Sequence, residues 1–535
     1  MREYVVVSPN EESIDSLHAD LTTTTNKPNI PNRIVEVANP RELNNVITHY
    51  YLEDHEATAL ANDTRVQHIH LNPLREMAKH FTTYGKMLNA TETPIAFNGT
   101  HGTFTRTGAN PDLYNVNWGL RRTGLAAPEA TPGTTYTYDE DGTGVDIVIM
   151  DDGVQPNHPE FLDNTGTSRV QQINWYTTSP TPNTPMPTGF YNLSIQGEGE
   201  HSTHVAGIAA GKTYGYAKGA KIYSMRIFDN TINGTKSFTN DIGTAFDLIR
   251  YWHLAKPNDP ATGLKRPTIV NMSWGFAWYY SGNPNNTNAK VINNINYRGT
   301  AHNYTSRVSY QSAYGQVGPV HGFRVPSIDT QVQQGMAAGI IYVAAAGNYS
   351  HKVDKTTGTD YNNYYKSNVY GVNPPGVATY YHRGSSPMGT VNVAAADYSL
   401  VSVQNVLKEQ LASYSERGPG VDVVSPGTYI TSSTSLLSTF SPFAYDFGTS
   451  GQNNNKACKI SGTSMATPQV TGICALHLAR HPETTPVQML AWVTANSKKN
   501  VVNTTTTDND WLNSRALLTQ ANNYLYNPYH NGFTD

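Results

Sequence analysis

The chain has 535 residues, of which 38% are hydrophobic and 15% are charged, and its formal net charge at pH 7 is -4. A chain of this length can bury a large core, so we expect one large domain with a smaller appendage. The small net charge and the lack of a lysine or arginine cluster exclude nucleic acid and anionic membranes as partners bound through a basic surface.

The N-terminal apolar stretch covers only residues 4–7, which is too short for the core of a signal peptide. No segment approaches the roughly 20 apolar residues of a membrane-spanning helix. We therefore expect a soluble protein that is located in the cytoplasm or associated with a particle or virion.

Residues 1–75 have the pattern of a small α+β domain. Helices are expected after the capping box Ser8-Pro9-Asn10-Glu11, over residues 39–50 and around residues 56–59. Strands are predicted at residues 4–7, 34–37 and 66–71. Residues 76–111 contain many Gly, Thr and Asn residues and are predicted to form a linker.

From residue 145 onward, short apolar segments alternate with helical patterns. This alternation predicts an α/β domain with a mostly parallel sheet that is covered by helices on both faces. The predicted strands are 145–150, 221–228, 268–272, 339–343, 391–396 and 421–424, and the predicted helices are 201–210, 242–252 and 464–480. The long connections 163–198, 276–330 and 349–388 are expected to be surface insertions.

Four polar segments follow predicted strands or open predicted helices. They are Asp151-Asp152-Gly153, His201-Ser202-Thr203-His204, Ala344-Ala345-Ala346-Gly347-Asn348 and Gly462-Thr463-Ser464-Met465-Ala466-Thr467-Pro468. Cleavage of an amide by a serine needs a base, a carboxylate that orients the base, and donors for the oxyanion. A serine at a helix N-terminus offers its own N–H and the positive end of the helix dipole. Pro468 is expected in the first turn of this helix, where its missing N–H costs nothing.

These segments resemble the signatures of the subtilisin-like (subtilase) family, and their order Asp, His, Ser is that of subtilisin itself. The resemblance continues through residues 114–120, 271–275 and 411–427 and covers roughly residues 112–480. It implies a subtilisin-like three-layer αβα fold and a serine endopeptidase acting on protein or peptide substrates. The catalytic domain would cover residues 112–525.

The family's motifs assign roles position by position. They imply that Asp151 orients the base, His201 is the base, Ser464 is the nucleophile and Asn348 donates its amide to the oxyanion. The motifs exclude the neighbouring Asp152, His204 and Ser461 from these roles, and Ser202 stands where the family usually has Gly. The resemblance also implies that the substrate is bound by Ser273, Trp274, Gly275, Ala345, Ala346 and Gly347, and lies along residues 233–239 as an added strand.

Three further features are implied by resemblance. Asp-Asp-Gly occurs in the kexin-like branch, so Asp152 is a candidate for contact with a basic residue at the substrate's second position; the alternative is a solvated turn carboxylate. The domain at residues 1–75 resembles the inhibitor-type propeptide of subtilases, which implies an intramolecular inhibitor and self-cleavage between residues 72 and 115; the alternative is an accessory domain. Glu160 stands where some members place a calcium ligand, although no cofactor is required for the chemistry.

A second function stays open at this point. The insertions rich in Asn, Thr and Tyr, with 34 tyrosines in the chain, also suit a structural or particle-associated protein that keeps a protease scaffold only for its own maturation. An intact set of Asp151, His201, Ser464 and Asn348 favours the active peptidase.

Overall fold

A computed structural model describes most of the chain. The described residues are 1–72 except 25 and 41, 78–80, 103–105, 117–125, 135–184, 199–227, 229–230, 236–237, 242–279, 292–303, 320–367, 378–435, 443–444, 456–504, 518 and 520–530.

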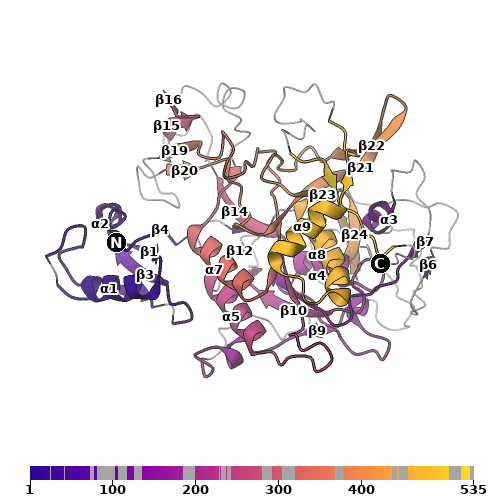
Figure 1. The fold of residues 1–535 in the computed structure, drawn as a ribbon, viewed down its shortest axis with the longest axis horizontal. Coiled ribbons are helices and arrows are strands. Elements are labelled where there is room, and N and C mark those ends of the chain that lie inside the picture. The colour runs from indigo at the N-terminus through magenta and orange to yellow at the C-terminus, as the bar shows by residue number, and fades with distance from the viewer. Residues whose placement is uncertain are drawn as a thin grey trace.

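The N-terminal domain is a four-stranded antiparallel sheet with two helices on one face (Figure 1). The order is β2-β3-β1-β4, from strands β1 (Arg2–Val7), β2 (Val37–Asn39), β3 (Ile47–Leu52) and β4 (His68–Leu71). The helices are α1 (Glu11–Leu21), which is capped by Asn10 rather than by Ser8, and α2 (Asp54–Leu60).

The helix predicted over residues 39–50 is wrong, because this segment ends in strand β3. The alternation of Ile47 and His49 with Tyr50 and Leu52 explains the difference. Tyr50 and Leu52 lie in the core with the helices, whereas Ile47 lies in a separate cluster with Val5 on the other face of the sheet.

A nine-strand path of mostly parallel strands forms the centre of the large domain. Its order is β27-β28-β23-β21-β18-β13-β8-β10-β9, and β22 pairs with β21. All neighbours on the path are parallel except β27 and β28. The strands are β8 (Asp146–Asp151), β9 (Val170–Gln171), β10 (Lys221–Arg226), β13 (Thr268–Met272), β18 (Ile341–Ala345), β21 (Val391–Val403), β22 (Val406–Leu411), β23 (Val423–Pro426), β27 (Lys498–Lys499) and β28 (Asn523–Tyr524).

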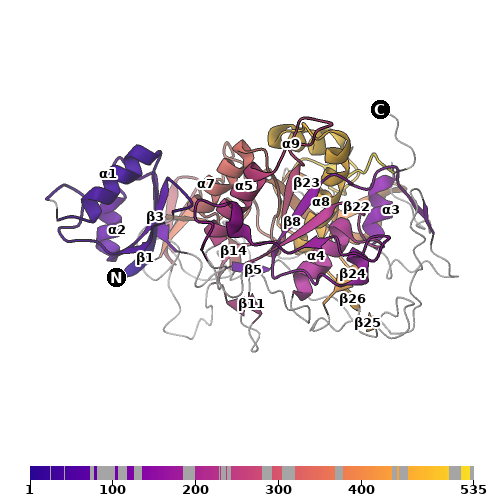
Figure 2. The ribbon, with the colours of Figure 1, turned by 90° about the horizontal axis from the view of Figure 1, so that it is seen from below.

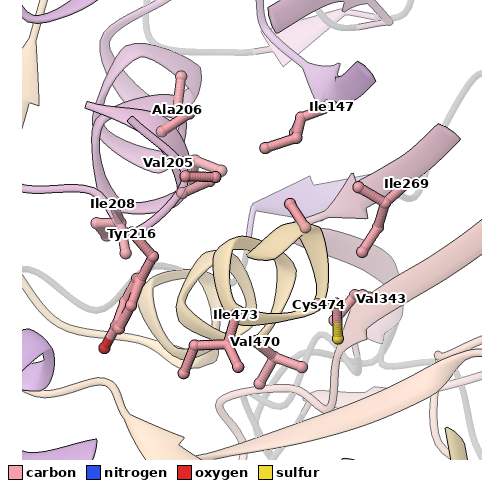
Figure 3. Close-up of a cluster of buried hydrophobic side chains, with 14 of the residues drawn as sticks. Ile147, Val205, Ala206, Ile208, Tyr216, Ile269, Val343, Val470, Ile473 and Cys474 are labelled. Carbon is pink, nitrogen blue, oxygen red and sulfur yellow. The ribbon is translucent and has the colours of Figure 1, made fainter. Parts of the chain in front are cut away.

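Helices cover both faces of this sheet (Figure 2). Alternate residues of β8 show the two layers: Ile147 and Ile149 pack in one core, and Val148 and Met150 in the other. The first core includes residues of α4 (Glu200–Ala210), α8 (Thr463–Arg480) and α9 (Pro486–Asn496), and the second includes α5 (Ile242–Ala255) and α7 (Pro326–Ala337). Figure 3 shows part of the first core, in which Val205 and Ile208 of α4 and Val470 and Ile473 of α8 lie in one cluster with Ile147 of β8. The predicted three-layer αβα architecture is confirmed.

Two of the predicted insertions meet in one additional sheet (Figure 1). Strand β15 of the first insertion pairs with β19 of the second, and the order is β16-β15-β19-β20. The strands are β15 (Ile292–Tyr297), β16 (Thr300–Asn303), β19 (Tyr364–Ser367) and β20 (Ala378–Tyr380). Another sheet has the order β24-β26-β25, and its strands are β24 (Ile430–Thr434), β25 (Phe443–Ala444) and β26 (Lys456–Ile460).

The N-terminal domain contacts the large domain through the face of its sheet that its own helices leave uncovered. Val5, Val7 and Ile47 on this face are at most 2% exposed, and β1 packs against α7. At the edge of the contact, the Asn44 amide donates to Asp247 Oδ1 at 2.9 Å on α5 and to Gln334 Oε1 at 2.8 Å on α7. The two domains are therefore joined by apolar packing and by a buried polar bridge.

Candidate active site

Asp151 and His201 form a buried pair. Asp151 ends β8, and His201 lies in the first turn of α4. The Oδ2 atom of Asp151 lies 2.8 Å from Nδ1 of His201, and both side chains have 0% exposure. The second oxygen of Asp151 accepts the backbone N–H of Asp152 at 2.8 Å. This arrangement holds the imidazole with its Nε2 atom directed away from the carboxylate, as a general base requires.

His204 lies one turn further along α4 and has a structural environment. Its Nε2 atom lies 3.1 Å from the carbonyl oxygens of Ile430 and of Cys458. Burial lowers its pKa to about 3, so the ring is neutral and donates to both carbonyls. The choice of His201 over His204 as the candidate base therefore agrees with the surroundings of the two rings.

Ser464 lies at the N-terminus of α8 and exchanges two hydrogen bonds with Ser273. The Ser464 hydroxyl donates to the Ser273 carbonyl at 2.7 Å, and the Ser273 hydroxyl donates to the Ser464 carbonyl at 2.8 Å. Because a hydroxyl has one hydrogen, the Ser464 hydroxyl has to turn away from the Ser273 carbonyl before it can donate to a histidine.

The second of these bonds has a cause in the sequence. In an α-helix the N–H of residue 468 would bond to the carbonyl of residue 464, but Pro468 has no N–H. Pro468 lies inside α8, beyond the first turn in which it was expected. The hydroxyl of Ser273 provides the missing donor and thereby fixes the backbone of Ser464.

Sheet register brings Ser273 close to the pair. Strands β13 and β8 are parallel neighbours with Asn271 opposite Ile149, so continuation by two residues sets Ser273 beside Asp151. Met272 is likewise opposite Ala344 of β18, after which the chain reaches Asn348. The candidate residues from three strands therefore gather at one carboxyl edge of the sheet, where the sites of open α/β sheets lie.

Asn348 has an orientation that its partners determine. Its Oδ1 atom accepts the backbone N–H of Thr463 and the Thr463 hydroxyl, both at 2.9 Å. Because a backbone N–H can only donate, the atom that faces it must be the oxygen of the amide. The Nδ2 group therefore points away from Thr463; it is buried and has no hydrogen-bond partner among the residues that the structure describes.

The predicted substrate-binding residues differ in what they contribute. The Trp274 side chain packs in the core beside Phe246 and Phe276 and donates to the Met150 carbonyl at 2.7 Å. Only its backbone, with that of Gly275, belongs to strand β14 (Trp274–Tyr279). Ala345 and Ala346 are fully buried, and Gly347 has φ +124°, which favours glycine. The other predicted binding segment, residues 233–239, lies outside the described residues except for 236–237.

Glu416 was not singled out by sequence reasoning. Its carboxyl group is 1% exposed, and a Cβ atom at position 347 would lie 2.6 Å from its Cδ. Burial raises the pKa of this group well above its usual value. The sequence signal that could have pointed to Glu416 is an acidic residue in the segment of mostly small residues, 411–420, that precedes β23.

The surroundings of Glu160 do not fit a calcium ion. Its Oε2 atom accepts the backbone N–H groups of Thr213 at 2.7 Å and Tyr214 at 3.3 Å. The nearby carbonyls of Lys212 and Gly215, at 3.0 and 2.6 Å, accept from the ammonium group of Lys218. One oxygen of the carboxylate and both of these carbonyls are thus already bonded to donors, an arrangement that does not suit a calcium ion. In the described part of the chain, no group of three or more His, Cys, Asp or Glu side chains could hold a metal ion.

Comparisons with known proteins identify the family of this chain. The profile of the subtilase family matches residues 142–514, which is well over half of the chain. An extracellular serine proteinase of Thermus sp. (strain Rt41A) is 26% identical over 369 residues, or 68% of this chain and 59% of that protein. A cuticle-degrading protease of Metarhizium anisopliae is 23% identical over 386 residues, or 72% of this chain and 66% of that protein. The matched part thus spans less than two thirds of the length of these relatives.

A solved structure supports the fold. Fervidolysin from Fervidobacterium pennivorans, a keratinolytic enzyme related to subtilisin, matches with a TM-score of 0.51 and 17% identity. The match covers 97% of this chain and 60% of that one. Among the helices that the structure describes, none has the length and apolar character needed to cross a membrane. Because the family profile matches residues 142–514, the chain belongs to the subtilase family of serine peptidases.

Proposed function

We propose that this protein is a serine endopeptidase with Asp151, His201 and Ser464 as its triad. The observation that supports this most directly is the buried 2.8 Å contact between Asp151 and His201 at the sheet edge that also holds Ser273. The site offers a base, a carboxylate that orients it, a serine at a helix N-terminus and a fixed amide donor.

The reaction then follows from these positions. The Ser464 oxygen attacks the carbonyl carbon of the substrate while its proton passes to Nε2 of His201. The oxyanion accepts from the Ser464 backbone N–H and from Nδ2 of Asn348. The amine leaves with the proton held by His201, and a water molecule hydrolyses the acyl-enzyme by the same steps in reverse.

An extended peptide is the substrate that suits β14. In this structure strand β5 (Ala78–His80) pairs antiparallel with β14, with His80 opposite Trp274 and Lys79 opposite Gly275. A substrate would take the same position and be recognised through its backbone as an added strand. The hypothesis that Asp152 contacts a basic substrate residue stays a proposal.

A fluorophosphonate probe tests the proposed activity. We expect it to label wild-type protein at Ser464, as shown by mass spectrometry of the peptide that contains residue 464. A protein that is only a scaffold, or particle-associated without activity, would stay unlabelled under the same conditions. Labelling without turnover of any denatured protein substrate would favour the alternative function, in which activity is restricted to maturation.

We further propose that residues 1–75 act as an intramolecular inhibitor that the protein cuts from itself. Residues 78–80 occupy the substrate strand, and the domain before them is anchored on α5 and α7 through Asn44. If the register continues by one residue, the position after His80 pairs with Ser273, whose carbonyl contacts the Ser464 hydroxyl. We therefore expect cleavage at the bond between positions 81 and 82, which lie outside the described residues.

N-terminal sequencing of the purified protein measures this cleavage directly. The expected new N-terminus is Thr82. Cleavage elsewhere within residues 72–115 would contradict the register and leave the inhibitor proposal standing, whereas a wild-type chain that keeps all 535 residues while labelling with the probe would contradict self-processing.

Release of the N-terminal domain is expected to depend on pH through His70. This residue faces the large domain on the same side of the sheet as Val5, its neighbour on β1, and is 1% exposed. Burial lowers its pKa from 6.5 to about 4, and the nearby His49 and His68 contribute. The neutral ring favours docking, so docking is strongest above pH 6.5 and weakens as the pH falls toward 4, by at most about 2 kcal/mol at pH 5.

The unfolding temperature of uncut Ser464→Ala protein, followed between pH 7.5 and pH 5, measures this effect. We expect acid to lower the temperature of the first unfolding transition less in His70→Leu than in the parent protein. The acid-induced decrease should persist in His55→Leu, since His55 is exposed on α2. The other charged groups near this face are Glu3, which contacts His49 at 2.8 Å, and Arg383, which lowers the pKa of His68. An unchanged pH dependence in His70→Leu would assign the effect to those groups instead.

A further inference from the structure

The turn that follows Asp151 is bonded to the helix turn that carries His201 by contacts outside the proposed triad. The backbone N–H of Ser202 donates to Oδ1 of Asp152 at 2.8 Å. The Ser202 hydroxyl donates to the Gly153 carbonyl. The backbone N–H of Gln155 donates to the Thr203 hydroxyl at 3.0 Å. Asp152, Ser202 and Thr203 have 0% exposure, so these bonds are protected from water.

The position of Asp152 is explained by the open end of α4. The first N–H groups of a helix have no partner within the helix, and the N-cap residue of α4 is Gly199, which has no side chain to cap them. The carboxylate of Asp152 accepts one of these N–H groups from another segment of the chain. A negative charge at this end of a helix is also favoured by the helix dipole.

The backbones themselves are in close contact at this point. A Cβ atom at position 199 would lie 1.4 Å from the carbonyl oxygen of Gly153, and Gly199 has φ +81°. No other residue fits there without moving the turn away from the helix. The Ser202 hydroxyl bonds to the same Gly153 carbonyl, a bond that a glycine at position 202 could not make.

We propose that Asp152 and Ser202 are positioning residues that hold the Asp151 and His201 pair in register. Each is the direct sequence neighbour of one member of the pair, so β8 and α4 are joined by two adjacent links. Loss of the outer link leaves the bond between Asp151 and His201 as the remaining one of these two links. This proposal rests on the proposed peptidase activity for its kinetic consequences, but its structural consequence does not depend on that activity.

This role competes with contact between Asp152 and a basic substrate residue. In the structure Asp152 is fully buried, and one of its oxygens bonds to the helix rather than facing solvent. A positioning role requires an acceptor atom, whereas a substrate contact requires a charge. Asp152→Asn keeps an acceptor and removes the charge, and Asp152→Ala removes both.

The kinetic test compares Ser202→Ala, Asp152→Ala and Asp152→Asn with Ser433→Ala. Ser433 is a matched control, because its buried hydroxyl donates to the Thr203 carbonyl at 3.0 Å without contacting the turn. The fluorophosphonate probe gives the concentration of active sites. We expect kcat to fall about tenfold in Ser202→Ala and in Asp152→Ala, with KM unchanged. Ser433→Ala should stay within about threefold of wild type, and Asp152→Asn, which keeps the acceptor, should lose less kcat than Asp152→Ala.

A spectroscopic measurement on Ser464→Ala protein keeps the proposal independent of peptidase activity. The proton between His201 Nδ1 and Asp151 should give a far-downfield NMR resonance. We expect this resonance to be sharp in the Ser464→Ala protein and in the double variant that also carries Ser433→Ala. We expect the resonance to broaden or disappear when Ser202→Ala is added. An unchanged resonance overturns the positioning role even if the protein cleaves peptides. A rise in KM for basic peptides alone, with kcat unchanged in Asp152→Asn, would indicate instead that Asp152 contacts the substrate.

Discussion

Replacing Ser464 by alanine is expected to lower kcat for peptide hydrolysis by about 10⁶-fold, the magnitude measured for loss of the nucleophile in subtilisin. The variant keeps Asn348, the α8 N-terminus and the substrate strand, so binding should persist while the acyl-enzyme cannot form. We also expect the purified variant to keep the bond between positions 81 and 82 intact.

Ser461→Ala is the matched control for this prediction. Ser461 lies three residues before the nucleophile, and its hydroxyl accepts the backbone N–H of Tyr429 at 2.9 Å. Wild-type-like turnover and processing in Ser461→Ala, together with loss of both in Ser464→Ala, would assign the chemistry to Ser464. Residual turnover of the Ser464→Ala protein above about one thousandth of wild type would point to another nucleophile.

Replacing Asn348 by leucine is expected to lower kcat by about 10²–10³-fold with little change in KM, the loss known from removal of the oxyanion amide in subtilisin. The two bonds from Thr463 fix which end of the amide is directed away from α8. Leucine has a similar volume but no donor, so the transition state loses a hydrogen bond that the bound substrate does not make.

Steady-state kinetics on a short chromogenic peptide separate the two parameters. Thr463→Ala removes only one of the two bonds that orient the amide, so a smaller loss of about tenfold in kcat is expected. A rise in KM with unchanged kcat in Asn348→Leu would contradict an oxyanion role and indicate a contact with the ground state instead.

Sequence reasoning was most successful where one local property determines the structure. Strands buried on both faces consist of continuous apolar residues, and β8, β13 and β18 were found in this way. Residues 39–50 were misassigned because Leu43 and Val46 suit a helical period, whereas Leu43 packs in the core of the large domain and Val46 packs against Val5, Val7 and Ile47 of the small sheet. Helix α9 was missed although Thr485 and Gln488 form a capping box at its start.

The candidate site was only partly predictable for a similar reason. Short motifs singled out the proposed catalytic residues, because each motif is continuous in the sequence. The bond between Asp152 and Ser202 joins residues 50 positions apart, and the contact of Glu416 with Gly347 likewise depends on the packed fold. Neither contact has a local signature, so no reading of the chain alone could establish what these side chains touch.

The position of β28 has a consequence for synthesis of the protein. This strand comes from residues 523–524, yet it pairs with β23 inside the sheet, and β27 pairs with it in turn. Because translation proceeds from the N-terminus, a nascent chain can form the N-terminal domain early, whereas the edge of the sheet beside β23 stays open until the last part of the chain has left the ribosome. The ribosome would thus carry a chain with a folded N-terminal domain before the sheet of the large domain can be completed.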